Sequence, residues 1–382
     1  MGPIAMNLHD ALPFVPLGAA LLGGFAYLLW RRRPPSRPRA DASAAARAPA
    51  IARPGTPAAG KPPRPERGTL GRYRIERPLG RGSMGVVYLG YDSQPARAVA
   101  IKTMALSREF EVADLAEARA RFFREAETAG RLRHRDIVAV FEAGEDQGLA
   151  FIAMEYVEGH DLLRYTLPGR LLPVPVVLRT LARVACALAY AHTQGVVHRD
   201  VKPANVMIDP ESDTVKVTDF GIARITDACR TRTGLVLGTP SFMSPEQMAG
   251  RRVDGRSDLY SLGVMLFQLL TGALPHRSEG MAELLRQIAF EAAPDVRTLR
   301  PELPEALADV LTLALEKRPE LRYADGAQMA SDLVAIADRL DSQSAAPPAP
   351  ALEPGAAATA EADAFAARPE FSRIDPRHNA EH

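Results

Sequence analysis

Residues 198–221 read HRDVKPANVMI, then a short polar stretch, then VKVTDFG. Two carboxylates, Asp200 and Asp219, lie within twenty residues of each other, with Lys202 and Asn205 between them. Phosphoryl transfer needs cations that neutralise the phosphate, oxygen ligands that hold those cations, and one carboxylate that orients the attacking hydroxyl. The segment supplies all of these groups.

The spacing divides these residues between two local structures. Asp200 and Asn205 share one loop, so the acceptor's proton and a metal ion can be placed on one rigid element. Asp219 opens a glycine-containing turn after an apolar strand expected at 214–218, where a second metal contact can reach the phosphates from the other side. A chance match to H-R-D-x-K-P-x-N followed by D-F-G is very improbable, so we predict a phosphoryl-transfer site.

The two motifs resemble the catalytic and metal-binding loops of protein kinases, with Val201 in place of the usual leucine. Lys202-Pro203 is similar to the Ser/Thr type rather than the tyrosine type. With the Met-Ser-Pro-Glu run at 243–246, the chain is most similar to the bacterial Hanks-type Ser/Thr kinases. The likeness covers about residues 70–340.

The resemblance implies an α+β, two-lobed protein-kinase fold, with a small β-rich N-lobe at about 70–157 and a larger helical C-lobe at about 158–340. ATP and Mg²⁺, or Mn²⁺, would lie between the lobes, and Ser/Thr hydroxyls of proteins would be the acceptors. A length of 382 residues suits such an enzyme with extra segments. A net charge of +1 gives no general attraction to nucleic acid, and we expect none as a partner.

The resemblance also assigns roles within the catalytic segment. Asp200 would orient the hydroxyl, and Lys202 would neutralise charge on the transferring group. Asn205 and Asp219 would hold Mg²⁺. Two other classes stay open: a pseudokinase scaffold, which would lack one of these groups or the nucleotide lysine, and a small-molecule phosphotransferase, which would lack the S-P-E and G-T elements found here.

Residues 79–88 contain G-x-G-x-x-G-x-V, with glycines at Gly80, Gly82 and Gly85. The pattern alone is weak, because dinucleotide-binding folds share it. Such a fold needs a helix after the last glycine, but residues 86–89 are β-branched and aromatic and therefore predict a strand. We therefore prefer a strand-turn-strand flap over the phosphates of ATP, where glycines let the backbone approach the phosphate oxygens.

Lys102 ends the run Val-Ala-Ile-Lys, which matches the kinase lysine motif. An unpaired ammonium in an apolar strand is costly, so a partner is expected in the charged helix at about 115–133. Glu125 and Glu127 face different sides of that helix, so only one can point inward. Resemblance to F-x-R-E-A selects Glu125, and a solvated charged face is the alternative.

Residues 148–156 form a mostly apolar run that predicts a strand ending at a kinase-like hinge. Met154 would be the gatekeeper, and the backbone of Glu155 and Val157 would pair with adenine. Asp161 matches the position that contacts the ribose, although an aspartate capping the next helix fits nearly as well. The other nucleotide contacts implied by the resemblance, each equally at home in an ordinary core, are Leu79, Val87, Ala100 and Met207.

Residues 175–192 predict a long buried helix that Gly195 can end, with Cys186 in its core. Cys229, the second of two cysteines, is expected in a loop. Their spacing argues against a disulfide framework and a zinc site, and fits a reducing compartment.

The activation segment, between Asp219 and Glu246, carries several threonines and arginines. Bacterial relatives resemble it in T-x-T, and our hypothesis is autophosphorylation on Thr231 and Thr233, possible in trans within a homodimer, after which Arg199 could bind a phosphothreonine. Thr239 would bond to Asp200 and Lys202 and help to select Ser/Thr acceptors. The alternative is an ordinary polar loop.

Further architectural pairs follow from the resemblance. Glu246 of the Ser-Pro-Glu run is expected to pair with buried Arg322, and Asp258 to cap the backbone of the catalytic loop. The remaining C-lobe helices are expected at 281–289, 304–316 and 326–340.

Residues 11–30 are uncharged and apolar, long enough to cross the hydrocarbon layer as a helix, and three arginines follow at once. The positive-inside rule places residues 1–10 outside and the kinase domain in the cytoplasm, which predicts a single-pass anchor in the inner membrane. A signal peptide would need a basic residue before the apolar run, and a buried core helix would need a surrounding domain.

Residues 31–68 hold nine prolines and carry ten basic residues against two acids, a net charge of +8. We expect a disordered basic tether that favours anionic headgroups, or else a merely solvated linker. The Ala/Pro-rich residues 341–382 are expected to be a disordered tail.

Overall fold

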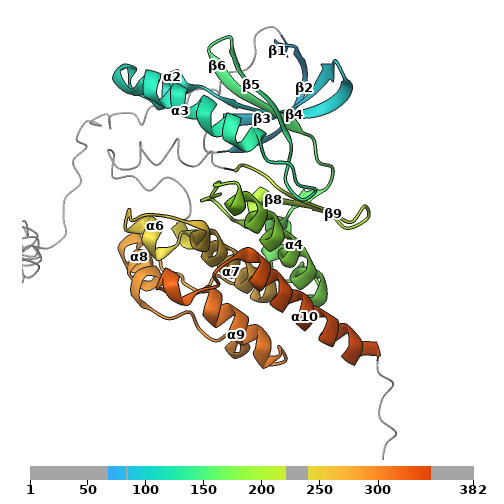
Figure 1. The fold of residues 1–382 in the computed structure, drawn as a ribbon, viewed down its shortest axis with the longest axis vertical. Coiled ribbons are helices and arrows are strands. Elements are labelled where there is room, and N and C mark those ends of the chain that lie inside the picture. The colour runs from blue at the N-terminus through green and yellow to red at the C-terminus, as the bar shows by residue number, and fades with distance from the viewer. Residues whose placement is uncertain (1–67, 83–84, 221–239, 346–382) are drawn as a thin grey trace, which may run out of the picture. The chain divides into compact units, whose positions relative to one another are not determined.

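The computed structural model describes residues 68–82, 85–220 and 240–345. An antiparallel sheet with two helices comes first along the chain, and a mainly helical part follows (Figure 1). This order confirms the predicted α+β organisation, with a β-rich N-lobe and a helical C-lobe. The predicted transmembrane segment at 11–30 lies outside the described residues.

The N-lobe sheet has six strands in the order β1-β2-β3-β4-β6-β5, and every neighbouring pair is antiparallel. Residues of β3 alternate between buried and partly buried, as expected where the two faces of a sheet differ. Strand β6, between β4 and the edge strand β5, is almost wholly buried. The strands are β1 (Thr69–Leu70), β2 (Tyr73–Gly82), β3 (Gly85–Ser93), β4 (Ala96–Met104), β5 (Val140–Asp146) and β6 (Leu149–Glu155).

Helices α2 (Leu106–Glu109) and α3 (Val112–Gly130) follow β4. The buried residues of α3 recur every three or four positions, so they share one face of the helix: Ala118, Phe122, Ala126 and Ala129. Phe122 and Ala126 of this face pack in a cluster with residues of β4 and β6, which fixes the helix beside the sheet.

A small sheet of three strands carries the catalytic segment. It consists of β7 (His160–Asp161), β8 (Val206–Asp209) and β9 (Thr214–Val217), in the order β7-β8-β9. Strand β9 forms a bridge with Ile137, and the amide of Val138 donates to the carbonyl of Val217 at 2.9 Å. The segment leading to β5 is therefore tied to the strand that ends next to Asp219.

All helices predicted for the C-lobe are present, with ends shifted by a few residues. Helix α10 continues past residue 340. The helices are α4 (Val174–Thr193), α6 (Pro245–Met248), α7 (Gly255–Thr271), α8 (Met281–Phe290), α9 (Glu305–Ala314) and α10 (Gly326–Ala345). Short 3-10 turns connect them at η1 (Leu162–Thr166), η2 (Pro203–Asn205), η3 (Pro240–Phe242), η4 (Val296–Thr298) and η5 (Pro319–Leu321).

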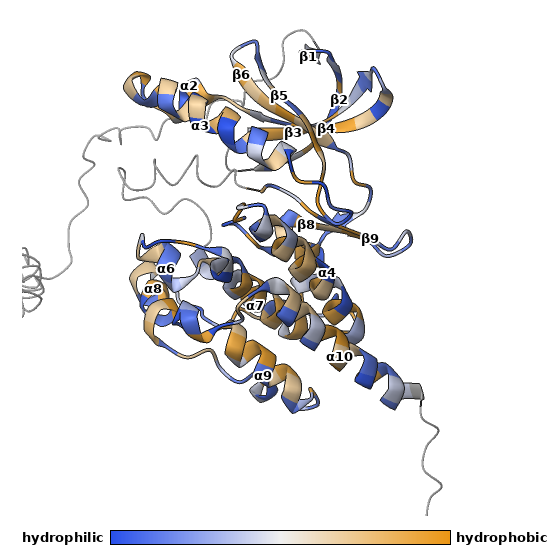
Figure 2. Cartoon of the chain, viewed as in Figure 1, coloured by the Kyte–Doolittle hydropathy of each residue, from blue (hydrophilic) through white to orange (hydrophobic). Residues whose placement is uncertain are grey.

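Helix α7 is the centre of the C-lobe core, since most of its residues are buried all round. A Cβ added to Gly263 would lie 2.8 Å from the Cβ of Ala314, so glycine permits the close approach of α7 and α9. Hydropathy colouring shows apolar residues following α4 and α7 through this lobe (Figure 2).

The prediction for Cys186 was wrong, because its side chain is exposed. Half of the residues of α4 are buried, but a stripe of exposed and partly exposed residues remains at Arg179, Arg183, Cys186 and Tyr190, spaced for one helix face. Among the described residues, α4 is also the helix long and apolar enough to span a membrane. Over half of that apolar window is buried within the fold, as in a core helix.

Candidate active site

The catalytic loop is attached to strand β9 through His198, whose side chain is fully buried. Its Nε2 lies 2.8 Å from the carbonyl oxygen of Thr218, and its Nδ1 accepts from the amide of Asp200 at 3.2 Å. A neutral ring protonated on Nε2 satisfies both contacts. His198 therefore holds Asp200 in place relative to Asp219, the residue after Thr218.

Asp258, in the first turn of α7, fixes the backbone of the catalytic loop. Its carboxylate accepts the amide of His198 at 2.8 Å and the amide of Arg199 at 2.7 Å, and lies 2.8 Å from Nε2 of His192. This confirms the predicted capping of the loop backbone. Arg199 has φ +67°, a left-handed conformation that costs a non-glycine residue about 1 kcal/mol or more.

Lys202, predicted as catalytic, and Asn205, predicted as a metal ligand, both contact the carboxylate of Asp200. Nζ of Lys202 donates to Oδ2 at 2.7 Å, and Nδ2 of Asn205 donates to the same oxygen at 3.0 Å and to the Asp200 carbonyl at 2.7 Å. The 3-10 turn η2 places Asn205 one turn beyond the aspartate. Because the amide nitrogen of Asn205 is engaged, its amide oxygen is the atom left to bind a cation.

Asp219 carries a buried oxygen with no partner. Its Oδ2 forms an ion pair with Nζ of Lys102 at 2.8 Å, whereas Oδ1 has no hydrogen-bond partner among the described residues. Its φ of +66° is left-handed. Burial acts to raise the pKa of Asp219, but attraction to Lys102 and the hydrogen bond to it outweigh burial and lower the pKa below its ordinary value. The group is therefore an anion at neutral pH.

The ion pair of Lys102 differs from the prediction. Within the described part of the chain, Lys102 pairs with Asp219 and forms no ion pair with Glu125, which lies partly buried on α3. A buried carboxylate needs a cation, and the neighbouring ammonium is the group that meets this need. Lys102 lies opposite Val87 in the β3–β4 ladder and opposite Ile152 in β6, so its position on the sheet is well determined.

Several of the predicted adenine residues lie in one small apolar cluster. Ala100 and Met154 are neighbours across the β4–β6 ladder, and Val87 and Val157 pack against them. The amide of Glu155 donates to the carbonyl of Ala139 at 2.8 Å, so only its carbonyl could pair with adenine.

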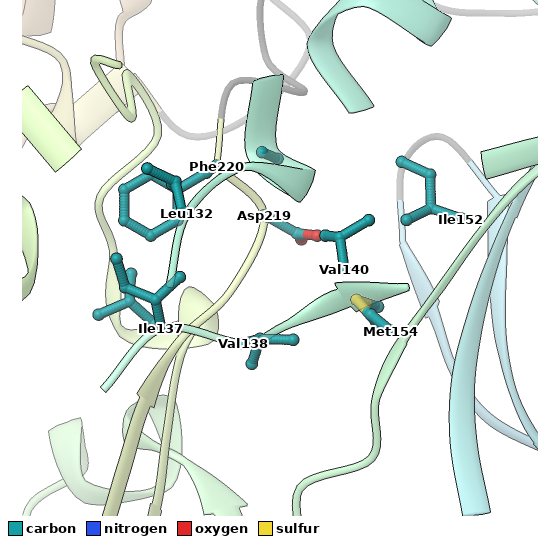
Figure 3. Close-up of a pocket in the computed structure, with 10 residues that line it drawn as sticks. Leu132, Ile137, Val138, Val140, Ile152, Met154, Asp219 and Phe220 are labelled. Atoms are coloured by element: carbon teal, nitrogen blue, oxygen red, sulfur yellow. The ribbon is translucent and has the colours of Figure 1, made fainter. Parts of the chain in front are cut away.

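Met207 and Asp161 lie opposite each other in the β7–β8 ladder, beside the catalytic segment, and Met207 is not a member of the cluster. Figure 3 shows a small cavity lined by Met154 and Asp219, among other residues. Asp219 is the one acid among the lining residues.

Of two glycines in the predicted flap, Gly85 has a steric reason to be glycine and Gly80 has none. A Cβ on Gly85, whose φ is +158°, would lie 1.7 Å from the carbonyl oxygen of Thr103 and cannot fit. A Cβ on Gly80 would meet nothing within 4 Å. Gly82 ends β2, and Leu79 in the same strand is exposed. The residues between Gly82 and Gly85 lie outside the described part, as do Thr231, Thr233 and Thr239.

Comparison with known proteins decides the family. Residues 73–333 match the family model for the protein kinase domain. The chain belongs to the protein kinase family. Within it, the chain is similar to bacterial Hanks-type Ser/Thr kinases, as its motifs predicted.

Several curated bacterial kinases are similar to this kinase domain. Serine/threonine-protein kinase Pkn1 of Myxococcus xanthus is 38% identical over 276 residues, which is 71% of this chain and 39% of that protein. PrkC of Bacillus subtilis is 37% identical over 274 residues, 71% of this chain and 42% of that protein. The chain therefore spans less than half the length of these two relatives.

A solved structure shares the fold of the kinase domain. The kinase domain of Mycobacterium tuberculosis PknI has a TM-score of 0.57 and 33% sequence identity, and the match covers 70% of this chain and 97% of that one.

The kinase domain suits Mg²⁺ and ATP by the chemistry of its donors. The unpaired Oδ1 of Asp219 and the amide oxygen of Asn205 are hard oxygen ligands. No group of three or more acidic, His or Cys residues that could hold a metal occurs among the described residues. Mg²⁺ is usually held by one or two protein ligands together with substrate phosphates.

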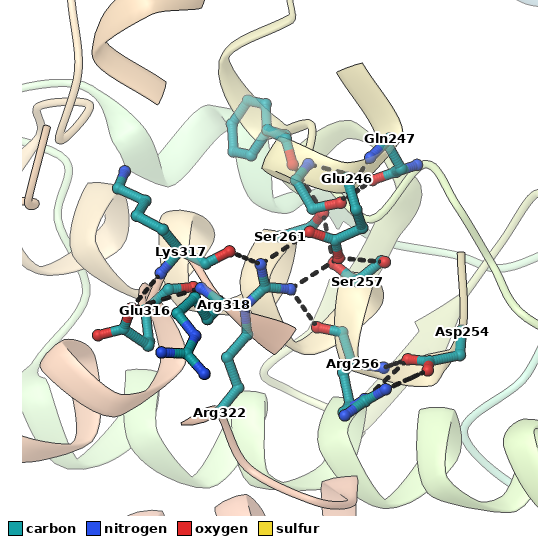
Figure 4. Close-up of polar contacts among 12 residues, drawn as sticks. Glu246, Gln247, Asp254, Arg256, Ser257, Ser261, Glu316, Lys317, Arg318 and Arg322 are labelled. Carbon is teal, nitrogen blue, oxygen red and sulfur yellow. Dashed lines mark hydrogen bonds and ion pairs between the residues drawn. The ribbon is translucent and has the colours of Figure 1, made fainter. Parts of the chain in front are cut away.

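The kinase's Ser-Pro-Glu segment is anchored as predicted. Arg322 is buried and donates to both carboxylate oxygens of Glu246, at 2.7 and 2.8 Å, and Ser257 adds a further hydrogen bond (Figure 4). Burial acts to raise the pKa of Glu246, but its hydrogen bonds to Arg322 and Ser257 lower the pKa overall.

Two polar contacts in the site were not predicted. Lys216 of β9 donates to the Glu155 side chain at 2.8 Å, which joins the hinge to the strand before Asp219. Gln247 of α6 reaches the catalytic loop. Neither residue type is unusual for its place in the sequence, and both contacts join segments distant along the chain.

Proposed function

We propose that this chain transfers the γ-phosphate of ATP to Ser and Thr hydroxyls of proteins. The observation that carries the proposal is the convergence of Lys202 and Asn205 on Asp200, next to Asp219 with its unpaired oxygen. Asp200 orients the acceptor hydroxyl and accepts its proton. Lys202 offsets the negative charge that spreads over the transferring group.

Nucleotide and metal are assigned to the remaining residues. Lys102 contacts the α- and β-phosphates, and Glu125 is proposed to support it when nucleotide is bound. Asn205 and Asp219 hold Mg²⁺, which neutralises phosphate charge when present. The adenine lies in the cluster of Val87, Ala100 and Met154, against the Glu155 carbonyl and Val157, with Leu79 and Met207 at its faces and Asp161 near the ribose.

The Mg²⁺ dependence of the activity tests the assignment of Asp219 as a metal ligand. Asp219→Asn removes the charge that binds the cation, so we expect kcat/KM to fall at least 100-fold at saturating Mg²⁺. Asp209→Asn, at the last residue of β8, is the control and retains activity. Equal Mg²⁺ dependence of the Asp219 variant and the wild type would contradict the assignment.

Activation by autophosphorylation is a further part of the proposal. We propose that Thr231 and Thr233 are modified, within a transient homodimer if the reaction is in trans, and that Thr239 helps to select hydroxyl acceptors. The support is the T-x-T pattern at 231–233 within an arginine-containing activation segment, together with Arg199 directly before Asp200 as the guanidinium proposed to bind the phosphothreonine. Mass spectrometry of wild type and of a Thr231→Ala/Thr233→Ala double variant tests it. Full activity of the double variant, with no phosphate at these sites in the wild type, would contradict it.

We also propose that residues 11–30 anchor the kinase in the inner membrane as a single pass, with its catalytic domain in the cytoplasm. The support is an uncharged twenty-residue run followed by three arginines. Carbonate extraction of cells expressing the full chain tests it. We expect the protein in the membrane pellet, whereas release into the soluble fraction would contradict the anchor.

A further inference from the structure

In the peptide that joins Arg199 to Asp200, both the N–H and the C=O form hydrogen bonds. Its N–H, on Asp200, donates to Nδ1 of His198 at 3.2 Å, and its C=O, on Arg199, accepts from Nε2 of Gln247 at 2.9 Å. The preceding amide, on Arg199, donates to Asp258 at 2.7 Å. These three bonds surround a residue in the left-handed conformation, φ +67°.

Gln247 is itself fixed by a capping box at the start of α6. Its Oε1 accepts from the amide of Ser244 at 3.1 Å, and its own amide donates to the Ser244 hydroxyl at 3.3 Å. Ser244 is fully buried. Since Oε1 is taken by the cap, the amide group is oriented with Nε2 toward Arg199.

We infer that Gln247 is a positioning residue for the catalytic aspartate. A left-handed arginine relaxes to a commoner conformation unless its neighbouring peptides are restrained, and this relaxation would rotate the Arg199–Asp200 peptide. Rotation of that peptide turns the Asp200 side chain. Gln247 thus couples the anchored end of the activation segment to the residue that orients the hydroxyl. The inference rests on the proposed function.

The variant Gln247→Glu separates this role from helix capping. Glutamate at the third helical position keeps the oxygen that accepts from Ser244, and it suits a capping box. An ionised carboxylate cannot donate to the Arg199 carbonyl and repels it. We expect kcat for phosphorylation of a protein acceptor to fall about tenfold or more, with KM for ATP and the Tm close to wild type.

Gln328→Glu is the matched control. Gln328 occupies the same place in α10, where its amide donates to Oδ1 of Asp325 at 2.9 Å, and it is far along the chain from the catalytic loop. The same change in charge there should leave kcat, KM and Tm unaltered. A second variant, Ser244→Ala, weakens the cap but leaves the donor on Gln247. It should therefore lower the Tm while kcat stays close to that of the wild type.

The outcomes are distinct. Wild-type kcat in the Gln247→Glu protein would overturn the inference and leave the proposed function untouched. The inference would also be overturned if Gln247→Glu lowered both the Tm and kcat, and Ser244→Ala lowered kcat by the same factor at the same Tm. Absence of phosphorylation by the wild-type chain would instead overturn the proposed function.

Discussion

Charge compensation at single residues determines the electrostatics of the site. Asp219 is kept anionic in a mostly buried position by Lys102, and its second oxygen is left unpaired. The same ammonium is assigned to the phosphates of ATP. The Lys102–Asp219 pair therefore holds both residues near their working positions.

This pairing predicts a measurable coupling. Lys102→Met leaves a buried carboxylate without its cation and should lower the free energy of unfolding by about 3 kcal/mol. In the Lys102→Met/Asp219→Asn double variant the loss should be smaller than the sum of the single losses, with a coupling energy of about 1–3 kcal/mol. Urea denaturation of the four proteins measures it. Additive losses would contradict the pair.

His276 is a second buried titrating residue, outside the active site. It lies 3.1 Å from Nζ of Lys317, which also donates to the carbonyl of Ile288. Burial, with repulsion from Lys317, lowers the pKa of His276 to about 4, and attraction to Glu291 opposes this weakly. Burial and repulsion from Arg322 likewise lower the pKa of Lys317 to about 8.

The pH dependence follows from the sign of this shift. Between pH about 6.5 and about 4 the unfolded chain protonates His276 while the folded chain does not, so stability falls as the pH falls through that window. The loss should be about 2 kcal/mol in the wild type and absent in His276→Phe. Denaturation at pH 7 and pH 4.5 checks this, and equal losses in both proteins would contradict it.

At the scale of elements, long-range polar contacts connect segments whose local structure is predictable. Helices α4 and α8 and strand β6 lie where apolar patterns placed them, within a residue or two. The exposure of Cys186 could not be predicted, because α4 is apolar on nearly every face and pattern alone does not show which stripe a neighbour covers. Capping of the loop by Asp258 was predictable only through family resemblance.

The anchor between α6 and the turn after η5 should be stabilising. Arg322→Met leaves Glu246 buried with Ser257 alone, so we expect the free energy of unfolding to fall by about 3–5 kcal/mol. Arg318→Met removes an exposed arginine from the same turn and should change stability by less than about 1 kcal/mol. Similar losses from both changes, in denaturant titrations, would contradict the assignment.

The hinge contact predicts a selective kinetic effect. Lys216 and the amide of Ala139 both bond to the Glu155 side chain, which ties the end of β6 to β9. Lys216→Met should raise KM for ATP about 3- to 10-fold with kcat little changed, and Lys216→Arg should stay near wild type. Steady-state kinetics over ATP concentration measure this. A lower kcat at constant KM would contradict the expected role.

At the scale of the whole molecule, the sequence motifs were sufficient to predict the kinase domain and its main catalytic residues. Asp200, Lys202 and Asn205 were predicted to act together, and the structure brings them into direct contact. The partner of Lys102 was not predicted, because two acids on α3 and one on the D-F-G turn were all within reach by sequence. Gln247 and Lys216 were missed because their partners lie about 50 or more residues away.

Transfer of radiolabel from γ-labelled ATP to a protein acceptor is the most direct test of the central claim. We expect the full-length wild type with Mg²⁺ to give phosphoserine and phosphothreonine on a generic acceptor, and Asp200→Asn to lose at least about 1,000-fold in rate. No label on any protein from the wild type, or equal labelling by Asp200→Asn, would contradict the claim that these residues form a Ser/Thr kinase active site.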